Sequence, residues 1–464
     1  MKNLVKLLFI VVLASSCNGD FIELTPFSQA DAGDFYKTAN DFEVAVNGVY
    51  DVLQDGRLYG SRFEIVLEVR SDNGQFNDPA SNNGVNFSID NFTELPDNSA
   101  IEGPYIALYQ GISRANAILD RIDQVDIDVD FANRIKGETQ FLRGLFYFHL
   151  VRLYGDVPLV DREIAPDESG DFDRVPVSEI YEFIEADLTA AGLVLPLSYG
   201  TSDKGRATQG AANGLLAKVY LTQGKFGLAK VELEKVINSN VYSLLPSVAS
   251  VFSKDNELNE EIIFAVRYEK GAAGEHNSLS FDYTQNATID DDLVNAYEPL
   301  DERLPLVQYV TVSGSRRVPQ KYFDVLDPDE RNAGLDIIVL RYADILLMYA
   351  EVLNEEGYVA SDDSPAFQAL NAVRERAGDD LVLHTTAELN NQVTFREAVL
   401  KERRLELALE FHRWYDLKRT GTAISTFAAL GVTIQTCHLI YPIPKIAIDR
   451  AADPTNFPQN PLCN

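Results

Sequence analysis

Two long segments of this chain are rich in amide, carboxylate and aromatic side chains. Residues 71–104 and 271–332 contain many Asn, Asp, Gly, Ser and aromatic residues and show no helical period. A sugar ring has an apolar face on which an aromatic ring stacks, and a rim of hydroxyls that amides and carboxylates bond. Long loops in a folded protein are commonly functional. The candidate ligand-binding residues in them are Asp72, Asn73, Phe76, Asn77, Asn82, Asn83, Phe87, Phe281, Tyr283 and Asn286.

Each aromatic residue in these loops has a second interpretation, in which its side chain is buried and anchors the loop on the scaffold.

Enzymatic motifs are missing from the sequence: the five histidines lack zinc-binding spacing, and there is no GxSxG, Walker or Rossmann fingerprint. A glycosidase pair is defined by the separation of two carboxyl groups in space. The abundant acidic residues therefore leave a helical glycoside hydrolase open as an alternative.

Two aspartate runs resemble calcium ligands. Residues 126–130 begin like a calcium-binding loop, but Phe131 stands where the sharp turn needs glycine. Residues 290–292 are more typical of a helix start, where acidic side chains face the positive end of the dipole. We expect no cofactor, with a structural calcium ion as the weaker interpretation.

The N-terminus has the pattern of a secretory signal. Lys2 and Lys6 precede an apolar run that is too short to span a bilayer, which needs ~20 apolar residues. The small residues 14–16 then lead into Cys17. We predict a signal peptide over residues 1–16 and a lipid anchor on Cys17, with ordinary soluble secretion as the alternative.

The two remaining cysteines, Cys437 and Cys463, lie close together near the C-terminus. In an exported protein such a pair is a candidate disulfide, and two unpaired thiols are the alternative.

The chain has 71 acidic and 40 basic residues, a net charge of −31. This charge argues against nucleic-acid partners and favours a neutral ligand, although a local basic pocket could override the net field.

The elements that hold these loops are predicted to be helices. Apolar residues at helical spacing mark helices at about 39–55, 104–124, 131–155, 178–195, 207–239, 340–377 and 394–418. Ser364 followed by Pro365 is a typical helix start, and Thr394 with Glu397 is a candidate capping box. Residues 213–237 resemble a degenerate tetratricopeptide repeat. Helix pairs recur at 40–122, 131–195, 207–238 and 340–377, which indicates an all-α fold with about four stacked pairs.

Several stretches, in this order, are similar to motifs of the SusD/RagB family. They include DFIELTP, YIALYQGISRANAIL, ETQFLRGLFYFHLVRLYGDVPLV, RATQGAANGLLAKVYLTQGKFGLAKVELEKVI, LRYADILLMYAEVLNE, KERRLELALEFHRWYDLKRTG and LIYPIP. The resemblance runs along nearly the whole chain. It implies that residues 17–464 form a single SusD-like domain, in which four tetratricopeptide helix pairs form one wall and the long loops form a ligand platform.

The resemblance also implies a function. Proteins of this family look like non-enzymatic, lipid-anchored proteins of the outer membrane, exposed on the cell surface. They bind oligosaccharides or polysaccharides and deliver them to a SusC-like TonB-dependent transporter; some relatives serve peptide uptake, which stays an alternative. By position in the family's motifs, Asp72 and Arg376 are candidate ligand-binding residues, and structural ion pairs are their other interpretation. The single tryptophan, Trp414, is predicted to lie in the core.

Overall fold

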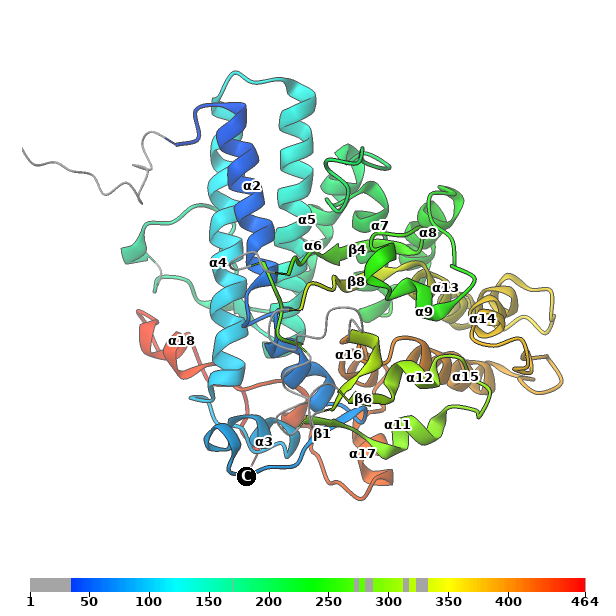
Figure 1. Ribbon diagram of the computed structural model, residues 1–464. Coiled ribbons are helices and arrows are strands. Elements are labelled where there is room, and N and C mark those ends of the chain that lie inside the picture. Colours follow the sequence, from blue (N-terminus) through cyan, green and yellow to red (C-terminus); the bar gives the residue numbers. More distant parts are fainter. Residues whose placement is uncertain are drawn as a thin grey trace, which may run out of the picture.

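A computed structural model describes residues 35–168, 170–270, 275–279, 287–311, 317–322 and 333–463. Helices dominate it, and the strands among these residues pair into two-stranded sheets (Figure 1). The predicted all-α class is therefore confirmed. Of the described helices, none combines the length and the apolar character needed to cross a membrane.

The first helix pair is α2 (Ala39–Gln54) with α4 (Ser99–Arg121). Thr38 begins α2 with a capping box, in which its hydroxyl accepts from the Asp41 N–H and the Asp41 carboxylate accepts from the Thr38 N–H. Phe42, Val46 and Val49 then form a fully buried stripe at helical spacing. Asn98 caps α4 by accepting from the Ala100 N–H.

The second pair is α5 (Val129–Tyr154) with α6 (Val177–Val194). Residues on nearly every side of α5 are buried after Ile135, because α5 packs against α2, α4, α6 and α7. Gly155 ends the helix with a φ of 74°, which glycine adopts without a Cβ clash. The predicted central position of this helix is confirmed.

The third pair is α7 (Gln209–Thr222) with α8 (Phe226–Asn238), and the fourth is α13 (Tyr342–Glu356) with α14 (Pro365–Arg376). Ser364 caps α14 as predicted. Successive pairs contact each other through α4 and α5, α6 and α7, and α8 and α13, so the predicted stack of four pairs is confirmed (Figure 1).

The helix predicted at 394–418 is wrong in two respects. The structure has two helices there, α15 (Gln392–Glu406) and α16 (Arg413–Arg419), and Asn391, not Thr394, is the N-cap. Leu409 and Phe411 between them have φ values of 66°. Such left-handed backbone is unusual for bulky residues, and here both side chains are buried in the core. Burial of these side chains outweighs the local preference for a continuous helix.

Short elements complete the fold. A buried π-helical turn, Glu64–Val69, leads into β1 (Gly74–Phe76), and α3 (Val85–Asp90) follows. The second predicted loop contains β5 (Ala287–Ile289), α11 (Asp291–Ala296), α12 (Leu304–Val307), β6 (Tyr309–Thr311) and β7 (Arg317–Pro319). Strand β4 (Ile262–Val266) pairs with β8 (Ile337–Arg341), and β2 (Val157–Pro158) with β3 (Arg174–Val175). The C-terminal part adds α17 (Ala423–Ala429) and α18 (Lys445–Arg450). Both loops are thus more regular than predicted.

Candidate ligand-binding face

The two predicted ligand loops meet in space. Strand β1 of the first loop pairs with β5 of the second as an antiparallel ladder from Gly74–Ile289 to Phe76–Ala287. The Asp290 N–H donates to the Asn73 carbonyl at 2.9 Å, and the Asn77 amide donates to the Thr288 hydroxyl at 2.9 Å. Figure 1 shows β1, α3 and α11 along one edge of the molecule. We call residues 72–92 and 287–292 the β1–β5 face.

Arg404 of α15 fixes this face from beneath. Its guanidinium donates to the Asn73 side-chain oxygen at 3.0 Å, to the Asp72 carbonyl at 2.7 Å and to the Asp292 carboxylate at 2.8 Å. One side chain therefore joins the start of β1 to the start of α11. The planar arrangement of arginine donors suits such divergent contacts.

Asp72 is not available to a ligand in this structure. It is buried, and both its oxygens accept from Arg413 at 2.7 Å. Burial acts to raise its pKa, but the hydrogen bonds and charge of Arg413, with Arg404 nearby, outweigh burial and lower the pKa. This geometry matches the alternative interpretation of Asp72, a structural ion pair.

Asn73 and Phe76 are also buried, which removes them from direct ligand contact. The Asn73 amide donates to Glu68 at 3.2 Å, and its oxygen accepts from Arg404. Glu68 also accepts from the Phe411 N–H at 2.6 Å. Burial raises the pKa of Glu68 to about 7, although these hydrogen bonds oppose the shift. These residues support the face from below.

Four candidates lie at the surface. Asn77, Asn82 and Asn83 are exposed, and Phe87 is half-buried, with part of its ring against the hydrophobic core. Asn82 and Asn83 have φ values of 49° and 55°, a left-handed conformation that Asn tolerates better than most residues. The structure thus has three exposed amides and a half-buried aromatic ring on one loop, and these are side-chain types that suit a sugar.

Arg376 lies in a buried ion network that is separate from the β1–β5 face. It pairs with Glu261 at 2.7 Å and with Glu406, and Glu406 also pairs with Arg341 and Arg303. All three arginines are buried. Its two terminal guanidinium nitrogens donate to Glu261 and Glu406 inside the protein, which matches the alternative interpretation of Arg376 as part of a structural ion pair.

Asp90 is a residue of this face that the sequence did not single out. Its carboxylate accepts from the Phe76 N–H at 2.9 Å and so ends β1. Burial raises its pKa to about 6, and the nearby charge of Asp290 adds to the shift. Phe281, Tyr283 and Asn286, like Cys17, lie outside the described residues.

Arg70 ties the first loop to the C-terminal part of the chain. Its buried guanidinium lies over the rings of Phe92, at 4.0 Å from the centroid, and Tyr441, at 4.8 Å. It also donates to the carbonyls of Ile89 and His438. Trp414 is buried beside these rings, as predicted.

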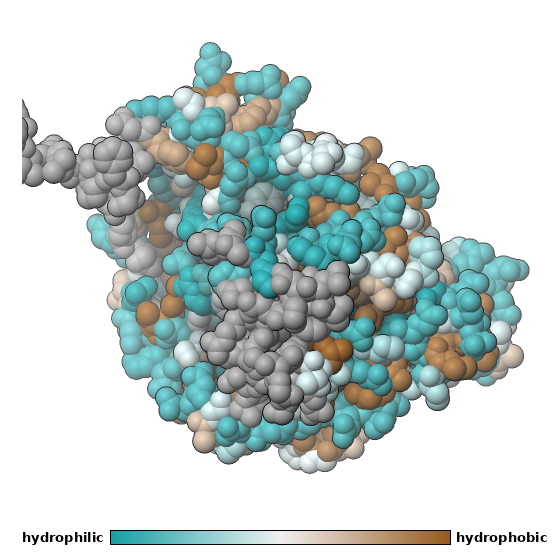
Figure 2. All heavy atoms as spheres, in the orientation of Figure 1, coloured by the Kyte–Doolittle hydropathy of each residue, from teal (hydrophilic) through white to brown (hydrophobic). Residues whose placement is uncertain are grey.

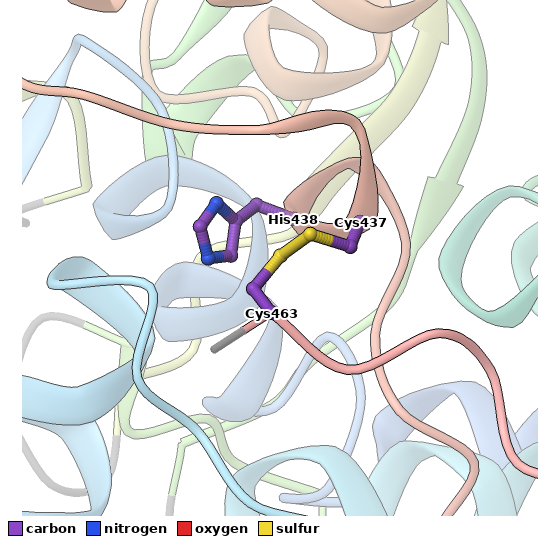
Figure 3. A group of neighbouring side chains, drawn as sticks. All are labelled: Cys437, His438 and Cys463. Carbon is purple, nitrogen blue, oxygen red and sulfur yellow. A yellow bond between two sulfur atoms is a disulfide. The ribbon is translucent and has the colours of Figure 1, made fainter.

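Cys437 and Cys463 form the disulfide that the sequence offered as one of two alternatives (Figure 3). Their Cα atoms are 5.6 Å apart, within the usual range. His438 lies beside the bond. Two oxidised sulfur atoms are not the thiolates that bind metal ions, so this group is a covalent staple for the C-terminal tail.

The two aspartate runs serve as helix starts. Asp128 caps α5 by accepting from the N–H groups of Asp130 and Phe131, and Asp290 caps α11 by accepting from the Asp292 N–H. Among the described residues, neither run gathers three acidic side chains around a common point. The calcium interpretation receives no support from this geometry.

Two ranges of this chain match models of known protein families. A family model described as "SusD family" matches residues 311–436, and one described as "Starch-binding associating with outer membrane" matches residues 20–221. The chain belongs to the SusD/RagB family. A SusD-like protein of Formosa agariphila is 26% identical over 98% of this chain and 99% of its own length.

Solved SusD-like structures share the fold. A SusD homologue from Bacteroides thetaiotaomicron has a TM-score of 0.80 at 24% identity, covering 93% of this chain and 98% of that one. A structure described as a laminarin-binding SusD-like protein has a TM-score of 0.77 at 26% identity, covering 92% of this chain and all of the other. The arrangement of helix pairs and loops is therefore that of the family.

Sequence analysis did not predict the internal supports of the β1–β5 face. Arg70, Arg404 and Arg413 contact the first loop from positions up to 341 residues away in the chain. The position of an arginine in a helical sequence pattern does not indicate which distant residue its guanidinium contacts. The one local sign was the cluster of arginines in KERRLELALEFHRWYDLKR, of which Arg403 is buried and the other three are half-buried.

Proposed function

We propose that this protein is a non-enzymatic surface lipoprotein that binds oligosaccharides or polysaccharides and delivers them to a SusC-like TonB-dependent transporter. The observation that carries the proposal is the joining of the two amide-rich loops through β1 and β5. The first of these loops exposes Asn77, Asn82 and Asn83. The proposal treats residues 17–464 as one domain, since one core cluster includes residues from Phe42 to Phe457.

The chemistry of the face favours a glycan. Exposed amides donate to and accept from hydroxyls, and the half-buried ring of Phe87 offers an apolar surface to C–H groups. Much of the surface in view is hydrophilic (Figure 2), and the net charge is −31. Repulsion by this charge favours neutral glycans over polyanions at the face.

The relatives support the same class of ligand. One solved relative is described as laminarin-binding, and another is a surface glycan-binding protein in complex with laminarihexaose. A partial match, covering 38% of this chain, is the starch-binding protein SusD. Neutral glucans are therefore the first ligands to test. The candidates Phe281, Tyr283 and Asn286, which lie outside the described residues, stay part of the proposed platform.

The decisive experiment removes exposed amides without disturbing the backbone. The variant Asn82→Gly/Asn83→Gly deletes two amide side chains, and glycine accepts their left-handed φ values. Asn240→Gly is the matched control, because Asn240 is exposed, has a φ of 55° and follows α8 on the helix wall. Calorimetry against a panel of neutral glycans should give saturable binding that is about 10-fold weaker in the double variant only. Equal affinities in all three proteins would contradict this location.

The same panel separates the alternatives. Release of reducing sugar at an enzymatic rate would replace the binding role by glycoside hydrolysis. Asp90 would be the first suspect, because a pKa of about 6 suits a general acid. Binding of peptides without binding of glycans would select peptide uptake.

Export and anchoring are tested through Cys17. We propose that acylation of Cys17 holds the mature chain on the outer membrane, with the helix wall towards the transporter. The variant Cys17→Ser should lose labelling by radioactive palmitate and leave the membrane fraction. Co-purification of the unmodified protein with a TonB-dependent transporter would support the partner, and its recovery as a soluble unlipidated protein would contradict the anchor.

A further inference from the structure

A cavity lies among the helices, away from the β1–β5 face. It has a volume of about 460 Å³ and opens between the end of α5, the start of α6 and α16. None of its lining residues belongs to the β1–β5 face. Cavities of this size accept small molecules. Its charged lining residues are Arg152, Asp156, Arg174, Lys418 and Arg419.

The charge of this cavity is opposite to that of the whole chain. Arg419 is neutralised by Glu351 and Asp416. Among the described residues, no carboxylate forms an ion pair with Arg152, Arg174 or Lys418. This differs from the fully buried arginines Arg303, Arg341 and Arg403, each of which pairs with carboxylates.

The three unpaired cations are held in place by neutral groups. The Arg152 guanidinium lies 3.6 Å from the ring centroids of both Phe148 and Tyr415, and its Nε donates to the Phe148 carbonyl. Lys418 donates to the Arg152 carbonyl. Aromatic faces and carbonyls orient these cations without cancelling their charge.

The third of these cations, Arg174, lies on strand β3. It donates to the carbonyls of Asp156 and Pro458 and to the side-chain oxygen of Asn460. Asp156 is the one acidic residue of the lining, and its carboxylate is exposed and accepts from the Val177 N–H. The lining therefore carries an excess of positive charge.

Partial burial of cations without a counter-ion is unfavourable. Burial lowers the pKa of Lys418 to about 7, and repulsion by Arg152 and Arg70 adds to the shift. Burial also lowers the pKa of Arg152. An anion in the cavity would relieve this cost, because guanidinium and ammonium groups bind carboxylate and phosphate oxygens with charge-assisted hydrogen bonds.

We propose that this cavity binds a small molecule through an oxyanion, a carboxylate or a phosphate group, held by Arg152, Arg174 and Lys418. The volume admits a ligand of sugar-acid or sugar-phosphate size. The site is separate from the proposed glycan platform. It can hold an anion despite the net charge, because low-dielectric walls make local charges dominate over distant ones, which salt screens within ~8 Å.

The test uses the full mature protein with its disulfide intact. Calorimetry at pH 6 and constant ionic strength compares inorganic phosphate, glucuronate and glucose. We expect saturable binding of at least one of the two anions and none of glucose at this site. Preference between phosphate and glucuronate identifies the group that the natural ligand carries.

Two variants locate the binding. Arg174→Gln and Lys418→Met should each weaken anion binding about 10-fold, the loss expected for one charge-assisted contact. Lys401→Gln removes the same charge from an exposed position on α15 and should change nothing. Anion affinity that is the same in all three variants, or no binding of either anion to the unmodified protein, would overturn the proposal. The second outcome needs no variant, so poor folding of a variant leaves the test decisive.

Discussion

Replacing Arg404 by Gln should release the β1–β5 face from its support. The exposed pair with Asp292 contributes little, since the Asp292 side chain is 46% exposed. The contacts with Asn73 and the Asp72 carbonyl are shielded and charge-assisted, worth about 1.5–3 kcal/mol each before non-additivity. Asp72 keeps its pair with Arg413, so no buried charge is left without a partner. The net local cost is therefore about 3 kcal/mol.

Hydrogen exchange measures this cost directly. A loss of about 3 kcal/mol makes amides that exchange by local opening exchange roughly 100-fold faster, so peptides containing β1 and β5 should show the change. Arg396→Gln is the control, because Arg396 lies on the same helix and pairs with Glu355 away from this face. Glycan affinity should fall with Arg404→Gln only. Unchanged exchange in both strands, or the same change in the control, would refute the supporting role of Arg404.

Three further predictions concern stability. Glu406→Gln should lower the free energy of unfolding by about 3–5 kcal/mol, because it leaves three buried arginines short of a carboxylate; denaturant titration checks this. The folded pKa of Glu68, about 7, lies above its unfolded value, so ionisation of Glu68 lowers the free energy of unfolding as pH rises from about 4.5 to 7. Glu68→Gln should therefore reduce the loss of stability between pH 5 and pH 8 by about 3 kcal/mol. An unaltered pH profile would contradict the shift. Reduction of the Cys437–Cys463 bond, which spans 26 residues, should destabilise the C-terminal segment by about 3 kcal/mol, seen as a lower melting temperature with reductant that Cys437→Ser/Cys463→Ser reproduces.

The helix pairs were predictable because their information is local. Phe42, Val46 and Val49 share one face of α2 by spacing alone, and Ser364 before Pro365 marks the start of α14. The end of α15 was not predictable, since no breaker residue lies between Glu406 and His412. The chain turns there because distant core packing holds Leu409 and Phe411 in left-handed conformations.

The burial of the candidate site residues was not predictable from composition. Composition brought attention to residues 71–104, but it could not separate the exposed Asn77 from the buried Asn73, four residues away. That difference depends on Arg404 and Glu68, which lie on the inner side of Asn73. Amide side chains suit both a ligand and a buried network, so residue type alone does not decide between them.

Some supports of the loops act on the backbone, alongside the side-chain pairs of Arg413 with Asp72 and of Arg404 with Asn73. Arg404 donates to the Asp72 carbonyl, Arg70 to the Ile89 carbonyl and Lys321 to the Ala408 carbonyl. A carbonyl is present whatever side chain stands at that position. Among the described contacts of Arg404, Arg70 and Lys321, none of these hydrogen bonds reaches the tip at Asn82 and Asn83. Substitutions at the tip can therefore change ligand preference at little cost to the scaffold, whereas substitutions of the arginines change the scaffold first.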